Sequence, residues 1–116
     1  MKNFELLAAL DGVWQPVFVV NPAIDGSDHA IYEITKVTGF ATGEPDTVIE
    51  VSGDVSVPTL TATSVLVDAS RYEREGDVQV FVKGWEGQEF AYFSVREFRK
   101  DSGHVSLILG DWLCGG

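Results

Sequence analysis

The stretch "DVQVFVKGWEGQEFAYFSVREF", residues 77–98, decides which fold to expect. Its first part places valines at alternate positions: Val78, Val80 and Val82. This period of two is typical of a strand with one buried face. An aromatic-rich run follows the glycine-containing segment 84–87, so the two runs predict a β-hairpin. A helix over 89–100 is the alternative for the second run.

Strand-like patterns continue on both sides of this hairpin. Residues 99–103 predict a second turn, and the alternating run 104–110 completes a three-stranded meander. Four further runs are strand candidates: 13–20, 31–40, 47–52 and 59–68. Pro16 cannot donate to a ladder, so we expect an edge or a bulge there. Turn-forming residues mark 21–30 as a loop.

A short helix is expected at the N-terminus. Asn3 is a favourable N-cap residue and Gly12 suits the C-terminal end. Phe4, Leu7 and Ala8 recur at helical spacing. The sequence shows no internal repeat, so we expect one domain over the whole chain. The predicted fold is mainly β, with α+β possible: an antiparallel sheet, a sandwich or a small barrel of six to seven strands with one short N-terminal helix.

The composition is that of a globular protein, with 45% hydrophobic and 22% charged residues. No run approaches the roughly 18 apolar residues that cross a bilayer. The apolar run 6–10 is too short for the core of a secretion signal. Cys114 is the single cysteine, which excludes an internal disulfide and suits a reducing compartment. We therefore expect a cytoplasmic protein.

The charge is strongly negative and unevenly distributed. The chain has 18 acidic and 8 basic residues, a net charge of −10. Residues 1–70 hold ten acidic and two basic residues, whereas residues 71–116 hold eight and six. A negative field repels nucleic acids and anionic membranes and speeds encounter with basic surfaces. Acidity that serves solubility alone is the other interpretation.

The stretch "GFATGEPDTVIEVSGD", residues 39–54, contains no lysine or arginine. On a strand, Glu50 projects opposite to its apolar neighbours, so we expect it on the outside. The neighbouring acids would extend one negative surface for a partner: Asp25, Asp28, Glu44, Asp46 and Asp54. Like charges this close repel one another, and a basic partner would relieve the repulsion.

Trp85 is a candidate interface anchor because it lies in the predicted turn between two strands. The other interpretation is that the turn folds back and Trp85 covers the end of the sheet. Trp14 and Trp112 lie in apolar runs, so we expect them in the core.

Motifs for catalysis or cofactor binding are absent from the sequence. Cys114 has no neighbouring histidine, and no G-x-S-x-G marks a serine nucleophile. Glycines are scattered at turns rather than grouped in a phosphate loop. Asp25, Asp28 and His29 are suitable ligand types, but neither an EF-hand nor a paired zinc motif surrounds them. We expect no catalytic residue, no metal site and no cofactor.

These features predict a non-enzymatic acidic binding protein. It would inhibit or neutralise a basic, nucleic-acid-handling protein, in the manner of an immunity protein or a phage anti-defence protein. We expect no direct contact with nucleic acid or membrane, and a homodimer is possible.

Two alternatives remain open for the function. A small barrel or sandwich would hold a small apolar ligand in an internal cavity, near aromatic residues of the second half: Phe81, Phe90, Tyr92, Phe93 and Phe98. A structural subunit would assemble through open sheet edges.

Overall fold

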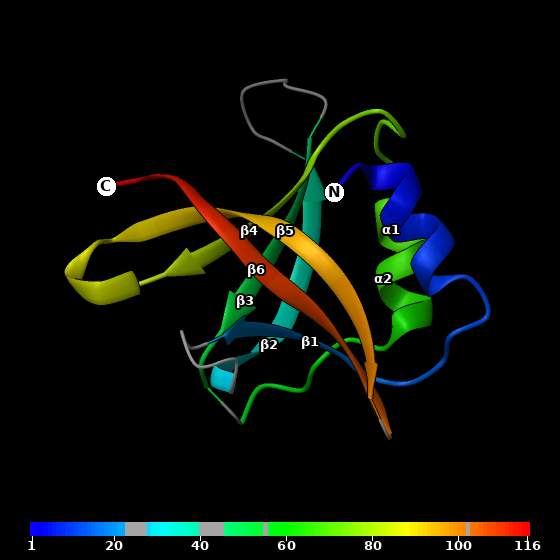
Figure 1. Cartoon of the computed structure of the whole chain (residues 1–116), viewed down its shortest axis with the longest axis horizontal. Helices are drawn as coiled ribbons and strands as arrows, with labels where there is room; N and C mark the ends of the chain where they lie inside the picture. Colours follow the sequence, from blue (N-terminus) through cyan, green and yellow to red (C-terminus); the bar gives the residue numbers. More distant parts are fainter. Residues whose placement is uncertain (23–27, 40–45, 55, 102) are drawn as a thin grey trace.

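The fold is described from a computed structural model of the chain (Figure 1). The structure describes residues 1–22, 28–39, 46–54, 56–101 and 103–116. The elements of the described part are, in chain order, α1 (Asn3–Leu10), β1 (Val17–Pro22), β2 (Asp28–Gly39), β3 (Thr47–Ser52), α2 (Ala62–Ala69), β4 (Val78–Lys83), the 3-10 helix η1 (Trp85–Gly87), β5 (Phe90–Asp101) and β6 (His104–Gly115).

The strands form a closed barrel in sequence order, in which β6 returns to pair with β1. The predicted mainly β fold with a short N-terminal helix is therefore confirmed, and of the expected architectures it is the small barrel. β4, β5 and β6 pair antiparallel in succession. The predicted meander is confirmed, and the alternative helix over 89–100 is wrong.

The barrel is mixed rather than purely antiparallel. β1 runs parallel to β6, and β3 runs parallel to β4. Parallel neighbours that follow one another in the chain need a crossover connection, because a tight turn reverses direction. The crossover from β3 to β4 contains α2, so the strand predicted over 59–68 is wrong.

The sequence of α2 explains why its helix was not predicted. Threonine and valine favour strands, but their preference is weak compared with tertiary packing. The buried positions of α2 are Ala62, Val65 and Ala69, which follow the spacing of a helix. Thr61 caps the helix by accepting a hydrogen bond from the backbone N–H of Ser64 at 3.4 Å.

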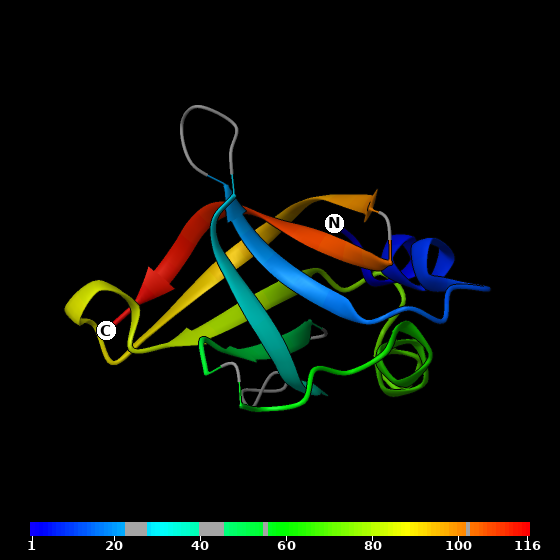
Figure 2. The same ribbon diagram turned by 90° about the horizontal axis from the view of Figure 1, so that it is seen from below.

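Alternate strand residues fill the barrel, and the two helices close one end of it. On β4 the inward residues are Val78, Val80 and Val82, as the sequence predicts. Leu6 and Leu10 of α1 and Val65 of α2 belong to the same core. In Figures 1 and 2 the helices lie at one end of the barrel, while η1 and the C-terminus lie at the other.

α1 forms where it is expected but buries a different face. Its N-cap is Lys2 rather than Asn3, and the predicted face of Phe4, Leu7 and Ala8 is not the buried one. The buried positions are Asn3, Leu6 and Leu10. The side-chain amide of Asn3 donates a hydrogen bond to the backbone oxygen of Ala69 at 2.9 Å, which ties α1 to the end of α2.

Two tryptophans expected in the core are exposed. Trp14 is 74% exposed in the connection between α1 and β1. Trp112 is 53% exposed in the part of β6 that continues past its pairing with β1. The prediction for both residues is wrong, because an apolar run alone does not show which of its residues face the core.

The two halves of the chain repeat one another in structure, although the sequence shows no repeat. Each half has an eight-residue helix, a six-residue strand, a twelve-residue strand and a third strand. Thr47 of β3 is paired with the first residue of β4, Val78. In the same way, Val105 of β6 is paired with the first residue of β1, Val17.

The hydrogen bonds and register repeat as well. The backbone N–H of Asn3 donates to Gly76 at 2.8 Å, and that of Ala62 donates to Gln15 at 2.9 Å. Register pairs correspond too: Phe18 with Glu33 in the first half, and Gln79 with Ser94 in the second. Positions in the first two strands of each half therefore correspond at a separation of 61 residues.

Candidate functional site

Asp46 and Asp54 flank β3 at its opposite ends, and each carboxylate has local partners. Asp46 accepts hydrogen bonds from the backbone N–H of Asp77 at 3.0 Å and from Gln79 Nε2 at 2.5 Å. Asp54 accepts from the hydroxyl of Ser56 at 2.7 Å and from its backbone N–H at 2.9 Å. These two bonds hold the pKa of Asp54 below the usual aspartate value. Both acids have structural roles, and β3 separates them.

Lys2 partly neutralises the acidic residues at the start of β4. Its ammonium lies 3.0 Å from a carboxylate oxygen of Asp77. Asp77 raises the pKa of Lys2 most strongly, and Glu75 and Asp46 raise it further. Three carboxylates act on one ammonium group here, so Lys2 neutralises this acidic group only in part.

Glu50 is the predicted site residue that projects from the barrel wall. Its neighbours Ile49 and Val51 are buried in the core, so the half-buried side chain of Glu50 faces outward. The register places it between Lys36 of β2 and Phe81 of β4. Glu50 thus borders an aromatic surface.

The side chains of three predicted acids lie outside the described residues. Asp25 and Glu44 lie outside the described residues. Asp28 begins β2, where its backbone pairs with Pro22, and its side chain is outside the described part. The other three predicted acids, Asp46, Glu50 and Asp54, are spread along β3 rather than gathered in one patch.

Trp85 is half-buried in η1 and closes its end of the core. Its indole packs edge-on against Phe93, with ring centroids 5.0 Å apart. Phe93 points into the barrel. The turn therefore folds back over the sheet, and the more outward aromatic residues lie on the strands beside it.

An aromatic cluster covers the outer surface of β4 and β5. Phe81 and Phe90 stack with ring centroids 6.0 Å apart and an interplanar angle of 18°. Tyr92 contacts both rings edge-on, at 5.1 Å from Phe81 and 5.7 Å from Phe90. All three are half-buried. We call these three residues the aromatic face, and Glu50, which lies opposite Phe81, borders it.

Tyr92 is held in its neutral form on this face. Burial raises its pKa most, and the neighbouring Cys114 and Glu50 raise it further. Cys114 lies opposite Tyr92 on β6 and is exposed. The aromatic face therefore consists of two apolar rings and a neutral phenol, with one carboxylate at its border.

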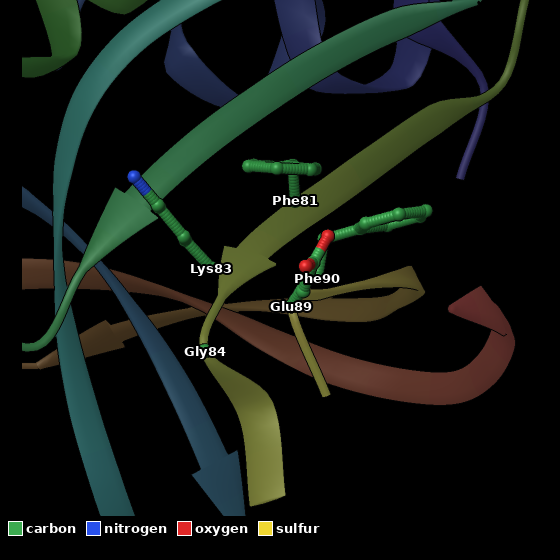
Figure 3. A pocket seen from close by; sticks show the side chains of 5 residues that line it. All are labelled: Phe81, Lys83, Gly84, Glu89 and Phe90. Atoms are coloured by element: carbon green, nitrogen blue, oxygen red, sulfur yellow. The ribbon is translucent and has the colours of Figure 1, made fainter. Parts of the chain in front are cut away.

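A hollow lies beside the aromatic face, at the end where β4 turns into β5. Its volume is about 600 Å³, and it is lined by Phe81, Lys83, Gly84, Glu89 and Phe90. Figure 3 shows these side chains around the turn, with Phe81 and Lys83 on β4 and with Glu89 and Phe90 at the start of β5. This volume is within the range of natural ligand sites.

The first half has aliphatic residues where the second half has two of these aromatics. At the separation of 61 residues, Val20 corresponds to Phe81 and Ile31 corresponds to Tyr92. Val20 is 1% exposed, whereas Phe81 is half-buried, so the two positions differ in their surroundings as well as in residue type. The aromatic face is therefore a departure from the repeat.

Sequence reasoning named these aromatics only for an internal ligand cavity. The alternation that turns Val80 and Val82 inward also turns Phe81 outward. That signal was present in the sequence, and it favours a surface site.

Comparisons with protein-family models, with curated proteins and with solved structures found no match for this chain. Within the described residues, no group of three or more His, Cys, Asp or Glu side chains is arranged to hold a metal ion. None of the helices in that part of the chain has the length and apolar character needed to span a membrane.

Proposed function

We propose that this chain is a non-enzymatic binding protein that neutralises a basic, nucleic-acid-handling protein by contact through its aromatic face. The observation that carries the proposal is the cluster of Phe81, Phe90 and Tyr92 beside Glu50 on the outer wall of the barrel. Aromatic residues are enriched at interface hot spots, where they supply buried area.

The net charge supports a basic partner. At −10, the chain attracts a basic surface over distances of several ångströms and repels a second copy of itself. Contact through the aromatic face then adds short-range affinity. A partner built to hold phosphates presents the cationic groove that such a protein would occupy.

The apolar-ligand alternative would use a different place from the one expected. The barrel interior is occupied by buried aliphatic and aromatic side chains, and the hollow lies on the outer surface. Assembly through open sheet edges has less free strand edge to use. Closure of the barrel pairs β1 with β6, so each of them has two neighbouring strands over their shared length. Both alternatives are less well supported than protein binding.

Capture from a lysate tests the proposal. We expect the immobilised protein to retain a basic protein at about 50 mM salt, with retention falling at least tenfold by about 500 mM as the charges are screened. Mass spectrometry identifies the partner. Glu50→Gln should weaken its retention, whereas Glu73→Gln, the same change at an exposed residue between α2 and β4, should not. The electrostatic part of the proposal is contradicted if the identified partner is acidic, or if its retention does not change with salt concentration.

A further inference from the structure

The hollow beside the aromatic face has the chemistry to hold one side chain of a bound segment. We propose that it receives an aromatic side chain of the partner, flanked in the partner's sequence by lysine or arginine. This inference rests on the proposed function and adds the chemistry of the segment that binds. The contacts around the hollow, its charges and its departure from the structural repeat support it.

The rings in the wall of the hollow favour an aromatic occupant. Phe81 and Phe90 lie nearly parallel, and both line the hollow. A further ring meeting them offset or edge-on gains contact energy beyond its buried area. The half-buried state of both phenylalanines leaves ring surface for that contact.

The wall is also held in place by the backbone. The N–H of Gly84 donates to the oxygen of Glu89 at 2.8 Å, which closes the turn between β4 and β5. The N–H of Glu89 donates to Gly116 at 2.7 Å, so the turn is anchored to the chain beyond β6 as well. Gly84 has a φ of +73°, a conformation that favours glycine and keeps this side of the hollow free of a side chain. A hollow fixed in this way loses little entropy on binding.

The charges around the hollow favour a cationic segment. Glu89 is in its lining, Glu50 borders the aromatic face, and the whole chain carries −10. Two lysines oppose a basic segment: Lys83 in the lining, and Lys36, which lies opposite Glu50 in the register. Lys83 therefore gives a test with the opposite sign to that of Glu89.

Three short peptides with blocked ends serve as probes: Lys-Trp-Lys, Glu-Trp-Glu and Lys-Ala-Lys. Each is titrated into ¹⁵N-labelled protein, and amide shifts are followed by NMR. We expect Lys-Trp-Lys to shift the amides of residues 83–84 and 89–90. Its affinity should exceed that of Glu-Trp-Glu about two- to fivefold, as one exposed charge pair allows, and that of Lys-Ala-Lys about tenfold.

Four variants separate the contributions. Phe81→Val introduces the residue found at the corresponding position of the first half, so it should preserve the barrel. It should lower the affinity for Lys-Trp-Lys about tenfold. Glu89→Gln should lower this affinity about two- to fivefold, and Lys83→Gln should raise it by a similar factor. Glu73→Gln is the control and should have no effect.

The proposal is overturned if Glu-Trp-Glu binds as tightly as Lys-Trp-Lys, if the shifts lie elsewhere, or if no peptide binds the folded protein at millimolar concentration. These outcomes leave the capture experiment untouched, because a basic partner can bind the aromatic face without using the hollow. Conversely, peptide binding without capture of a basic protein refutes the proposed function alone.

Discussion

Thr47 carries a polar group that the fold does not use. Its hydroxyl is fully buried and has no hydrogen-bond partner in the described structure. A buried polar group without a partner destabilises the native state. The corresponding residue of the second half is Val105, which is fully buried in the core.

Thr47→Val should therefore raise the free energy of unfolding by about 1 kcal/mol, since the change removes an unsatisfied hydroxyl at nearly constant volume. Chemical denaturation measures the difference. Thr59→Val is the matched control, because the hydroxyl of Thr59 donates to Val17 at 2.9 Å and accepts from Ile34 at 3.1 Å. It should destabilise the protein, and a loss of stability in both variants would contradict this account of Thr47.

Asp54 gives a pH-dependent test at the same scale. Ser56 stabilises its carboxylate, so the folded-state pKa is lowered relative to the unfolded chain. This contribution to stability is present above the unfolded value, about 3.9, and is lost as the pH falls through the folded pKa. An NMR titration of the Asp54 carboxyl should show the low pKa, and Ser56→Ala should raise it. An unchanged pKa in that variant would remove the Ser56 hydroxyl as the cause.

Sequence patterns predicted which residues of β4 point outward, but not which of these residues contact one another. The alternation of β4 correctly placed its valines in the core. It did not show that Phe81 and Tyr92 would meet Phe90 on one surface, because that contact depends on the register between β4 and β5. Register is a tertiary property, set by the turn and by burial together.

At the level of elements, strands were easier to predict than the helix that connects two of them. The bounds of β3 match the predicted run 47–52. α2 was missed because its Thr- and Val-rich sequence favours a strand locally, while the parallel pairing of β3 with β4 demands a crossover. The structural repeat was likewise invisible, since most corresponding positions carry different residue types, as Val20 and Phe81 do.

The end of β2 packs closely against the connection between α2 and β4. A Cβ at Gly39 would lie 2.7 Å from the ring of Tyr72, closer than two carbon atoms can approach. Gly39→Ala should therefore force the ring or the strand to move and reduce the free energy of unfolding by about 1–3 kcal/mol.

Gly53→Ala is the control, because nothing lies within 4 Å of a Cβ at that position. Thermal unfolding compares the two variants. Equal stability would show that β2 and Tyr72 are not in close contact in solution.

At the scale of the whole molecule, the predicted acids of the described part do not form one acidic patch. Asp46 and Asp54 lie beyond opposite ends of β3, and Lys2 pairs with Asp77. The net charge remains a long-range attraction toward basic surfaces. The specific contact in our proposal comes instead from the aromatic face, which interrupts the structural repeat of the barrel.

The most direct test of this claim converts the aromatic face into its first-half counterpart. Phe81→Val and Tyr92→Ile are combined in one variant, and binding to the basic partner identified by capture is measured by calorimetry. We expect the variant to fold and to bind at least tenfold more weakly, whereas Trp14→Ala, which removes an exposed aromatic residue from the connection between α1 and β1, binds normally. Unchanged affinity in the folded double variant would contradict the central claim.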